Sequence, residues 1–313
     1  MKLAPHEEKH LSILDDISAE CTLFLKRNKD FPISDIKEVA LYGSGVRHTL
    51  KGGTGSGNVD VHFFDNIEQA FLKEGVKVTT TEWLDRYDEL RKERKKQFIK
   101  EVKKEAKEYG VIAPAYSIGR NMEEFEYDIP LTSTSEIAIY ALSRNQGEGQ
   151  DRRLIKGDWY LTDTEIRDIL ELNRKHKRFL LVLNVASPLD ISPVLEVDNI
   201  LLLSQLGTRT SKTLFDIVTG KKYPSGKLSS TWAKIEEHPC FEEFGNDDDA
   251  YYKEGIFVGY RYFESFVSNS LFEFGFGSGF TDFKITPIEV KLDGDQVNIG
   301  HAYKEYVKHS RRL

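Results

Sequence analysis

Cysteine is nearly absent from this chain, which carries only Cys21 and Cys240 among its 313 residues. Two cysteines so far apart do not have the spacing of a disulfide framework or a zinc site. Long apolar runs are lacking too, and no stretch approaches the roughly 20 residues that a helix needs to cross a bilayer. The opening residues, MKLAPHEEKHLSILDD, lack the apolar core of a signal peptide. We therefore expect a cytoplasmic protein that does not contact a membrane.

An excess of positive charge is also missing. The chain has 44 Lys and Arg residues against 51 Asp and Glu residues, a net charge of -7, whereas proteins that bind nucleic acid are usually basic. One basic cluster, at positions 91–96, is interleaved with Glu89, Glu93 and Glu101 at helical spacing. That pattern indicates a solvated, salt-bridged helix face, so no nucleic-acid partner is expected.

Apolar runs of strand length are what the middle of the chain does contain. They are EIAIYAL (136–142), RFLLVLNV (178–185) and NILLLSQ (199–205). Runs without alternation are typical of parallel strands buried on both faces. Helical patterns accompany them: one opens with a capping box of Thr162 and Glu165, and another, TSKTLFDIVTG, is closed by Gly220. Alternating strands and helices predict a three-layer α/β/α sandwich around a doubly wound, mostly parallel sheet.

The flanking regions add further elements. Apolar residues at helical spacing predict a helix over 6–27, and IKEVALYG (36–43) predicts a short strand. A helix is predicted over 67–75, a strand follows at 76–80, and the charged stretch 81–109 has the periodicity for one apolar face. From Lys284 onward the sequence alternates like two half-exposed strands around the turn Asp293-Gly294.

Three motifs imitate cofactor sites without completing them. HEEKH (6–10) has the spacing of a zinc-protease helix, but no residue elsewhere suggests itself as the third ligand. VALYGSG resembles the start of a dinucleotide fold, with His48 in place of the third glycine. GKKYPSGKLSS lacks the glycine spacing of a phosphate loop, and Leu228 stands where a hydroxyl would meet magnesium. No metal and no other cofactor is expected.

Glu148 is the most informative single residue. It lies between Gly147 and Gly149, just after an apolar strand, and sheets of this class present their sites at the carboxyl ends of strands. The glycines let the backbone pass close to a ligand, and Asp151, Arg152 and Arg153 can brace the loop by ion pairs. The residues alone leave a functional glutamate and a solvated loop glutamate equally open.

The surrounding segment, SRNQGEGQDRRLIKGDWYLTDTE, resembles the acid/base loop of glycoside hydrolase family 3, the family of many β-glucosidases. Other segments resemble that family in the same order; they are CTLFLKRNKDFPI (21–33), VALYGSG, GGTGSG, PSGKLSSTW (224–232), EGIFVGYRYFES (254–265) and FEFGFGSGFTDF (272–283). Arg209 and Ser278 depart from the usual pattern. The resemblance implies that residues 1–283 form the family's α/β sandwich domain and that 284–313 are the incomplete start of a fibronectin-type-III-like domain.

The same resemblance implies a retaining β-glycosidase, β-glucosidase-like, in which Glu148 is the general acid/base. Retaining enzymes need a second carboxylate about 5–5.5 Å away as nucleophile, and in this family it is an aspartate on a (β/α)8 barrel. A minority of members carry the barrel after the sandwich, and this chain resembles such a protein truncated before the barrel. We expect the chain alone to be inactive.

The expected partners follow from this assignment. They are a β-glucoside or oligosaccharide substrate and either a barrel-domain partner or a second copy of the chain. Asp151 and Arg152 are assigned to the substrate cleft or to bracing of the loop, and Gly53, Thr54 and Gly55 to the border of the cleft or to a structural turn. The alternative function is a non-catalytic carbohydrate-binding or interaction module.

Overall fold

A six-stranded sheet lies at the centre of the computed structural model, which describes residues 3–117, 120–147, 152–239, 241, 251–266 and 269–307. The strand order is β1-β6-β5-β4-β2-β3. The strands are β1 (Leu23–Lys26), β2 (Glu38–Tyr42), β3 (Lys77–Val78), β4 (Ile137–Arg144), β5 (Arg178–Val185) and β6 (Ile200–Leu202). Neighbouring strands are parallel except for β1, which runs antiparallel to β6. The predicted mostly parallel, doubly wound sheet is confirmed.

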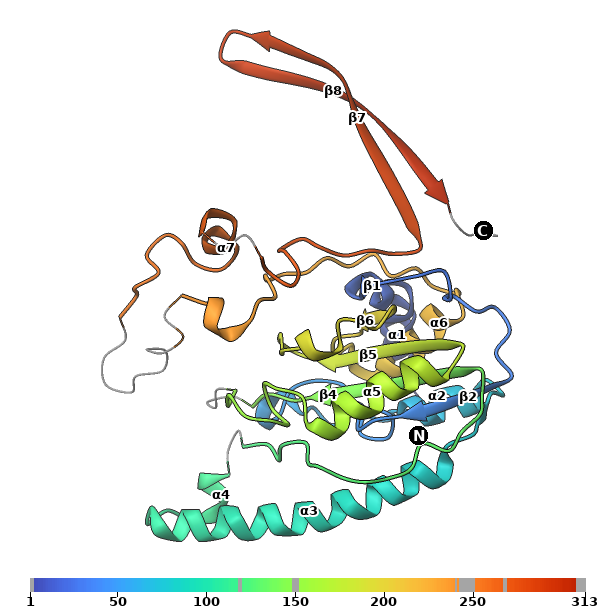
Figure 1. Ribbon diagram of the computed structural model, residues 1–313, viewed down its shortest axis with the longest axis vertical. Coiled ribbons are helices and arrows are strands. Elements are labelled where there is room, and N and C mark those ends of the chain that lie inside the picture. The colour runs from blue at the N-terminus through green and yellow to red at the C-terminus, as the bar shows by residue number, and fades with distance from the viewer. Residues whose placement is uncertain are drawn as a thin grey trace.

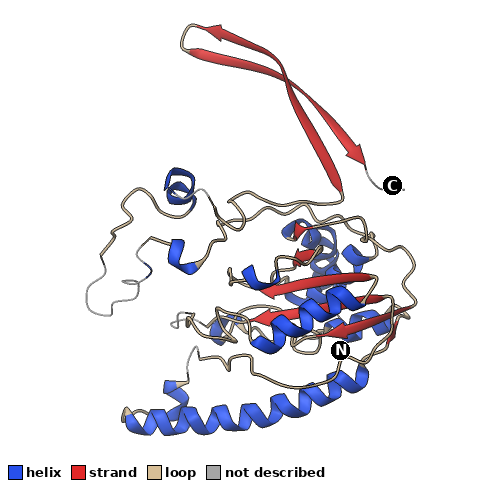
Figure 2. Cartoon of the chain, in the orientation of Figure 1, coloured by secondary structure: helices blue, strands red, loops and turns tan. Residues whose placement is uncertain are grey.

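Helices cover both faces of this sheet (Figures 1 and 2). On one face lie α5 (Asp163–Lys175) and the first half of α3 (Thr81–Glu108), and on the other α2 (Ile67–Lys73) packs against α6 (Thr210–Val218). The remaining helices are α1 (Pro5–Ile17), α4 (Ala113–Tyr116), α7 (Tyr260–Phe266) and the short 3₁₀ turns Ser18–Cys21, Gly55–Gly57, Ser192–Val194, Gly207–Arg209 and Ile235–Glu237. The predicted three-layer sandwich is therefore present.

An aromatic cluster fixes α3 to the sheet. The rings of Trp83 and Tyr87 stack with 5.6 Å between their centroids, and Trp83 meets Tyr42 of β2 edge to face at 5.2 Å. Tyr127 contacts both α3 rings and shares a hydrogen bond of 3.2 Å with Tyr140 of β4. Each such ring pair contributes about 0.5–1.5 kcal/mol beyond the area that it buries. This end of α3 is thus held in place, while its far end runs past the sheet (Figure 1).

The ends of two helices are as the sequence predicts. At the start of α5, the amide of Glu165 donates to Thr162 Oγ1 at 3.0 Å and the amide of Thr162 donates to Glu165 Oε2 at 2.9 Å. Past the end of α6, Gly220 has a φ of 76°, a left-handed conformation that glycine adopts without a steric penalty. The capping box and the glycine stop are both confirmed.

The predicted helix over 6–27 is wrong in its second half. Helix α1 ends at Ile17, and Leu23–Lys26 is the edge strand β1. Phe24 sits between two partners distant in sequence, because it pairs with Leu201 of β6 and its amide donates to the carbonyl of Ser278 at 3.0 Å. Those long-range backbone bonds outweigh the helical spacing of the apolar residues.

A two-stranded hairpin follows the sandwich. Strands β7 (Thr281–Asp293) and β8 (Gln296–Val307) turn at Gly294, whose φ is 59°. The predicted pair of strands and its turn are confirmed, and the first strand begins three residues before the expected position 284. The hairpin extends away from the sandwich (Figure 1), and one row of its apolar side chains, Ile288, Val290 and Leu292, is 61–78% exposed.

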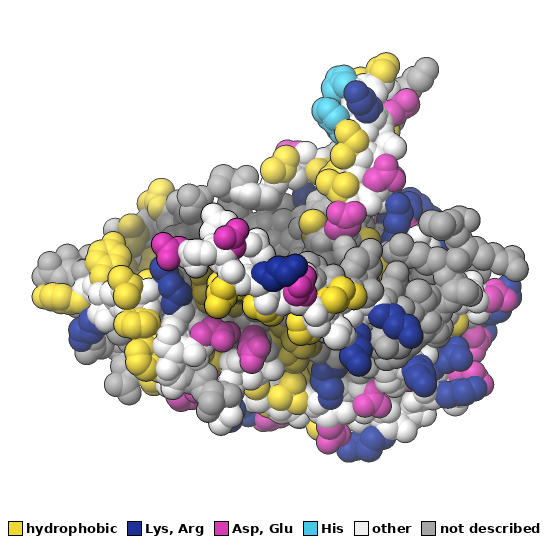
Figure 3. Space-filling model, turned by 90° about the horizontal axis from the view of Figure 1, so that it is seen from above, with side chains coloured by type: hydrophobic (Ala, Val, Ile, Leu, Met, Phe, Trp, Pro, Cys, Tyr) yellow, Lys and Arg dark blue, Asp and Glu magenta, His cyan; other side chains and the backbone are white. Residues whose placement is uncertain are grey.

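None of the described helices has the length and apolar character needed to cross a membrane. Large apolar side chains nevertheless gather on one end of the surface. Figure 3 shows them at the end of the molecule where Figure 1 places α7. In α7 and the described residues just before it, the exposed apolar side chains include Tyr251, Tyr252, Ile256, Tyr260 and Phe266.

Candidate active site

The crevice of this fold lies where the chain reverses its progress across the sheet. From β2 the chain passes to β3 on one side, and from β4 it passes to β5 and β6 on the other. Parallel α/β sheets bind ligands outside the carboxyl ends of the strands at such a switch point. The loops that follow β2 and β4 therefore frame the candidate site.

The turn after β2 is pressed against β4. The amide of Gly45 donates to the carbonyl of Ala141 at 2.8 Å. Gly43 has a φ of 90°, and a Cβ at this position would lie 2.5 Å from the same carbonyl. A Cβ at Gly45 would lie 2.6 Å from Ser143 Oγ. Both glycines are thus needed for the close approach of the backbones, and no helix follows until α2, in agreement with the interpretation of this segment as a tight turn.

Asn184 joins the end of β5 to the segments that follow β2 and β6. Its side chain is fully buried at the end of β5, accepts from the amide of Leu50 at 2.6 Å, and donates to the carbonyls of Leu50 at 3.1 Å and Ser204 at 2.6 Å. Ser204 has a φ of 61°, an unusual conformation for a residue with a side chain. Our sequence reasoning did not single out Asn184, although an amide inside the apolar run RFLLVLNV is a visible signal.

The structure brings the predicted glycine loop beside the loop after β4. Thr54 Oγ1 donates to the carbonyl of Gln146 at 3.4 Å, and a Cβ at Gly53 would lie 3.8 Å from that oxygen. Gly55 begins a short 3₁₀ turn. Gln146 is two residues before Glu148. The assignment of these three loop residues to a substrate cleft remains a prediction.

Glu148 and Asp151 lie outside the residues that the structure describes. The described residues on either side of this gap, Gly147 and Arg152, both line a cavity of about 770 Å³. Its walls come from the turn after β2, one face of α3, the segment 120–124, the end of β4 and the segment 152–158. The cavity therefore occupies the switch point between β2 and β4.

Arg152 holds the segment after the gap in place. Its Nε donates to Ser187 Oγ at 3.0 Å and its Nη1 donates to the carbonyl of Asp158 at 3.1 Å. The Arg152 side chain is 6% exposed, and burial lowers the pKa of its guanidinium. Arg153 also bonds to Asp158, through its amide at 2.9 Å, and forms an ion pair with Glu123.

A charged network continues from the cavity into the interior. Arg144, the last residue of β4, pairs with Glu165 at 2.6 Å. Burial opposes the charge of Arg144, but this carboxylate outweighs it and raises the pKa of the guanidinium. Glu124 accepts from Tyr87 Oη at 2.8 Å, and burial, reinforced by the charge of Glu165, raises the pKa of Glu124. The arrangement places a buried carboxyl group with a raised pKa, Glu124, in the cavity wall.

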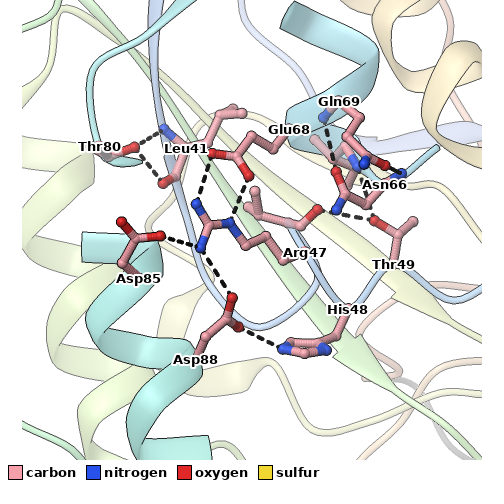
Figure 4. A network of polar contacts seen from close by, with 12 residues as sticks. Leu41, Arg47, His48, Thr49, Asn66, Glu68, Gln69, Thr80, Asp85 and Asp88 are labelled. Atoms are coloured by element: carbon pink, nitrogen blue, oxygen red, sulfur yellow. Dashed lines mark hydrogen bonds and ion pairs between the residues drawn. The ribbon is translucent and has the colours of Figure 1, made fainter. Parts of the chain in front are cut away.

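A second network fixes the turn after β2 to two helices (Figure 4). Arg47 pairs with Glu68 of α2 at 2.6 Å and with Asp85 and Asp88 of α3 at 2.6 and 3.0 Å. His48 Nε2 lies 2.8 Å from Asp88 Oδ1. Burial, together with the charge of Arg91, lowers the pKa of the His48 imidazole. Local sequence patterns do not reveal this network, because its members come from three separate segments.

The predicted solvated face of α3 is correct only in part. Arg94 pairs with Glu101 at 3.0 Å, as expected for a salt-bridged helix. Lys92 and Lys95 are exposed as predicted, but with the half-buried Arg91 they line the cavity. They point there because α3 passes beside the turn after β2, a relationship that helical spacing alone does not contain.

HEEKH lies in the exposed helix α1. Among the residues that the structure describes, no group of three or more His, Cys, Asp or Glu side chains is placed to hold a metal ion.

The sequence profile of the glycosyl hydrolase family 3 C-terminal domain matches residues 22–260. The chain belongs to glycoside hydrolase family 3. The match begins just before β1 and covers every strand of the central sheet and the cavity, so the resemblance inferred from the sequence is confirmed.

Individual members of family 3 agree with this assignment. β-Glucosidase A of Butyrivibrio fibrisolvens is 30% identical over 307 residues, which cover 88% of this chain and 35% of that enzyme. A β-glucosidase of Ruminococcus albus is 28% identical and covers 94% of this chain and 31% of its own length. β-Glucosidase 3B of Thermotoga neapolitana, solved with α-D-glucose, superposes with a TM-score of 0.74 at 28% identity, over 96% of this chain and 42% of its own. The chain thus spans about a third of the length of these curated relatives.

Proposed function

We propose that this chain is part of a retaining β-glycosidase, β-glucosidase-like, in which Glu148 is the general acid/base. The observation that supports this most directly is the position of Gly147, which precedes Glu148 and lines the cavity at the switch point of the sheet. Relatives that share its sequence along most of its length are named β-glucosidases. Glu148 first protonates the glycosidic oxygen and then takes a proton from the water that releases the sugar.

The nucleophile in this proposal is an aspartate on a barrel domain outside the 313 residues. The described carboxylates that line the cavity are already engaged, which supports a nucleophile from elsewhere. Each has a donor: Asp88 bonds to Arg47 and His48, Glu105 to Arg120 and Tyr116, Glu123 to Arg153, Glu124 to Tyr87, and Asp158 to Arg152 and Arg153. A carboxylate engaged in ion pairs or hydrogen bonds is a poorer nucleophile than a free one.

The barrel in this proposal docks on the face around the acid/base loop. Exposed apolar side chains occur in the segment after the glycine loop, at Val59 (63%), and in the segment after Asp151, at Leu154 (45%) and Ile155 (42%). Docking would bury them and exclude water from the loop, which raises the pKa of a catalytic acid. A second copy of this chain is the alternative occupant of the same face.

Reconstitution tests the proposal. The chain is mixed with the separately expressed barrel domain of the Butyrivibrio fibrisolvens relative, and hydrolysis of aryl and alkyl β-glucosides is followed. We expect no turnover by the chain alone and measurable turnover by the mixture. Glu148→Gln should lower turnover of alkyl glucosides by about 10²–10⁴-fold, the usual contribution of a general acid.

Substrates with different leaving groups distinguish the loss of a catalytic acid from a loss of folded protein. Dinitrophenyl glucosides need little protonation, so Glu148→Gln should slow them far less than alkyl glucosides. The control is Asp151→Asn, which should slow both substrates equally because this residue is expected to brace the loop. Turnover by the purified chain alone, or an active Glu148→Gln mixture on alkyl glucosides, would show that the proposal is wrong. Sugar binding by the chain with no catalysis in the mixture would favour the non-catalytic module.

A further inference from the structure

The cavity at the switch point is elongated along α3. Six residues of this helix line it, the first being Asp88 and the last Glu105, seventeen positions further along. At 1.5 Å per residue this stretch of helix is about 25 Å long. Helix α3 continues past the sheet (Figure 1), so the cavity leads from the strand end at Ser143 and Gly147 away from the sheet. A single sugar ring would fill only a fraction of this length.

The segment 120–124 forms the wall opposite α3 and is tied to the helix near both ends. At one end Tyr87 Oη donates to Glu124 Oε1 at 2.8 Å. At the other end Arg120 pairs with Glu105 at 2.7 Å. The segment therefore runs antiparallel to α3, and these bonds fix the distance between the two walls. We call the part of the cavity between them the α3 groove.

Polar side chains of both charges line the α3 groove. Lys92 and Lys95 on the helix are hydrogen-bond donors, and the carboxylates of Glu105 and Glu123 are acceptors with more than one lone pair each. Hydroxyl groups both donate and accept, so a ligand rich in hydroxyls can use both kinds of side chain. In the described lining of the whole cavity, the apolar side chains are only Leu50, Phe98 and Met122. The groove therefore suits a sugar better than a lipid or another wholly apolar chain.

Phe98 supplies an aromatic ring between the two ends of this groove. It is half-buried and lies ten residues after Asp88 and seven before Glu105. A pyranose ring carries hydroxyls around its rim and C–H groups on its faces. An aromatic ring can pack against such a face while polar neighbours bond to the rim, the combination of apolar and polar groups that is typical of small-molecule sites. Phe98 and Lys95, less than one helical turn apart, provide that combination on one face of α3.

We propose that the α3 groove binds the leaving-group part of a β-linked oligosaccharide several sugar units long, and that Lys95 and Phe98 determine the preference for long substrates. The leaving group is placed here because Gly147 lines the same cavity and precedes the proposed acid, which must meet the glycosidic oxygen. This assignment to the leaving group rests on the proposed function, whereas the binding of an oligosaccharide along α3 does not.

Binding to the intact 313-residue chain tests the inference without catalysis. Calorimetry compares the dimer and the pentamer of glucose in two linkages, cellobiose with cellopentaose and laminaribiose with laminaripentaose. In one of the two series we expect the pentamer to bind about tenfold more tightly than the dimer, because the added units form a few further hydrogen bonds. Equal affinities of dimer and pentamer in both series, or binding of neither series, would overturn the inference.

Paired variants of adjacent residues locate the site. Lys95→Ala is compared with Lys96→Ala, and Phe98→Ala with Ile99→Ala; Lys96 and Ile99 are exposed and lie outside the described lining. The lining variants should each reduce the ratio of pentamer to dimer affinity at least about threefold, about half of the expected tenfold preference on a free-energy scale, and their neighbours should keep it. Thermal unfolding checks that each variant is folded. The same reduction in a lining variant and its neighbour, or a ratio that survives both lining variants, would place binding elsewhere and overturn the inference.

Further outcomes separate this inference from the proposed function. Tighter binding of the pentamer by the chain, with no hydrolysis in the reconstituted mixture, would contradict the proposed function and leave an oligosaccharide site along α3. Hydrolysis by the mixture with equal kcat/KM for dimer and pentamer would do the reverse. Pentamer binding by the Glu148→Gln chain that disappears when the barrel domain is added would show that a protein surface fills the groove, and would overturn the leaving-group assignment.

Discussion

Arg144 and Glu165 form an ion pair inside the protein, with 2.6 Å between Nη2 and Oε2 and side chains that are 4% and 0% exposed. Arg144 ends β4, and Glu165 also closes the capping box of α5. One carboxylate therefore links β4, the strand that precedes Glu148, with the start of helix α5.

Glu165→Gln should test this link. Glutamine can still serve in the capping box, but the buried charge of Arg144 loses its counter-ion, and breaking a buried pair in this way costs about 3–5 kcal/mol. Urea unfolding measures the loss. Glu136→Gln is the control, because Glu136 pairs with Lys177 on the surface at 3.3 Å and exposed pairs contribute about 0–1 kcal/mol. An unchanged unfolding midpoint for Glu165→Gln would contradict the expectation.

Asp168 should make the fold more stable in mild acid. Its side chain is 0% exposed, and burial raises its pKa to about 6 despite the ion pair with Arg167. Because the folded state holds the proton more tightly than the unfolded state, ionised Asp168 destabilises the fold above pH 6. This penalty is lost as the pH falls from 6 toward 4.

Asp168→Asn should remove that penalty. We expect the variant to exceed the wild type in unfolding free energy by about 2–3 kcal/mol at pH 8, with the difference vanishing near pH 4. The control is Asp163→Asn, an exposed substitution on the same helix, which should not reproduce a gain of this size. A gain for Asp168→Asn that does not change with pH would rule out the titration as its cause.

Gly43 and Gly75 form a matched pair for substitution. Both have positive φ values, 90° and 79°, but a Cβ at Gly43 would lie 2.5 Å from the carbonyl of Ala141, while nothing lies within 4 Å of one at Gly75. Alanine at Gly75 meets backbone strain alone, about 1–2 kcal/mol, and alanine at Gly43 adds a clash with β4. Thermal unfolding should show a clearly larger loss for Gly43→Ala, and equal losses would mean that the turn moves away freely.

The elements that the sequence predicts well are those whose signal is local. Strand β5 is a continuous apolar run, and the ends of α5 and α6 are marked by Thr162, Glu165 and Gly220. Strand β1 was misassigned because Leu23 to Lys26 carry no such mark, and their partners are 169–254 residues away. An edge strand made by distant pairing is not encoded in its own residues.

The candidate site, too, has parts that the sequence predicts and parts that it does not. The role of Glu148 and that of the glycine loop are predictions that depend on the family resemblance, and the structure places Thr54 of the glycine loop beside Gln146. The position of Arg91, Lys92 and Lys95 in the cavity wall is not predicted from the sequence, in which they alternate with acidic residues. Helical spacing predicts which side chains lie on the same face of a helix. It does not predict which part of the fold packs against that face.

Gly45 lies in a turn, but its backbone amide is hydrogen-bonded to a strand of the sheet. Its N–H is buried and donates to Ala141 on β4 as a neighbouring strand would. Hydrogen exchange follows the opening of such bonds and not the labels of elements. The floor of the crevice should therefore exchange with deuterium as slowly as the strands and open only together with them.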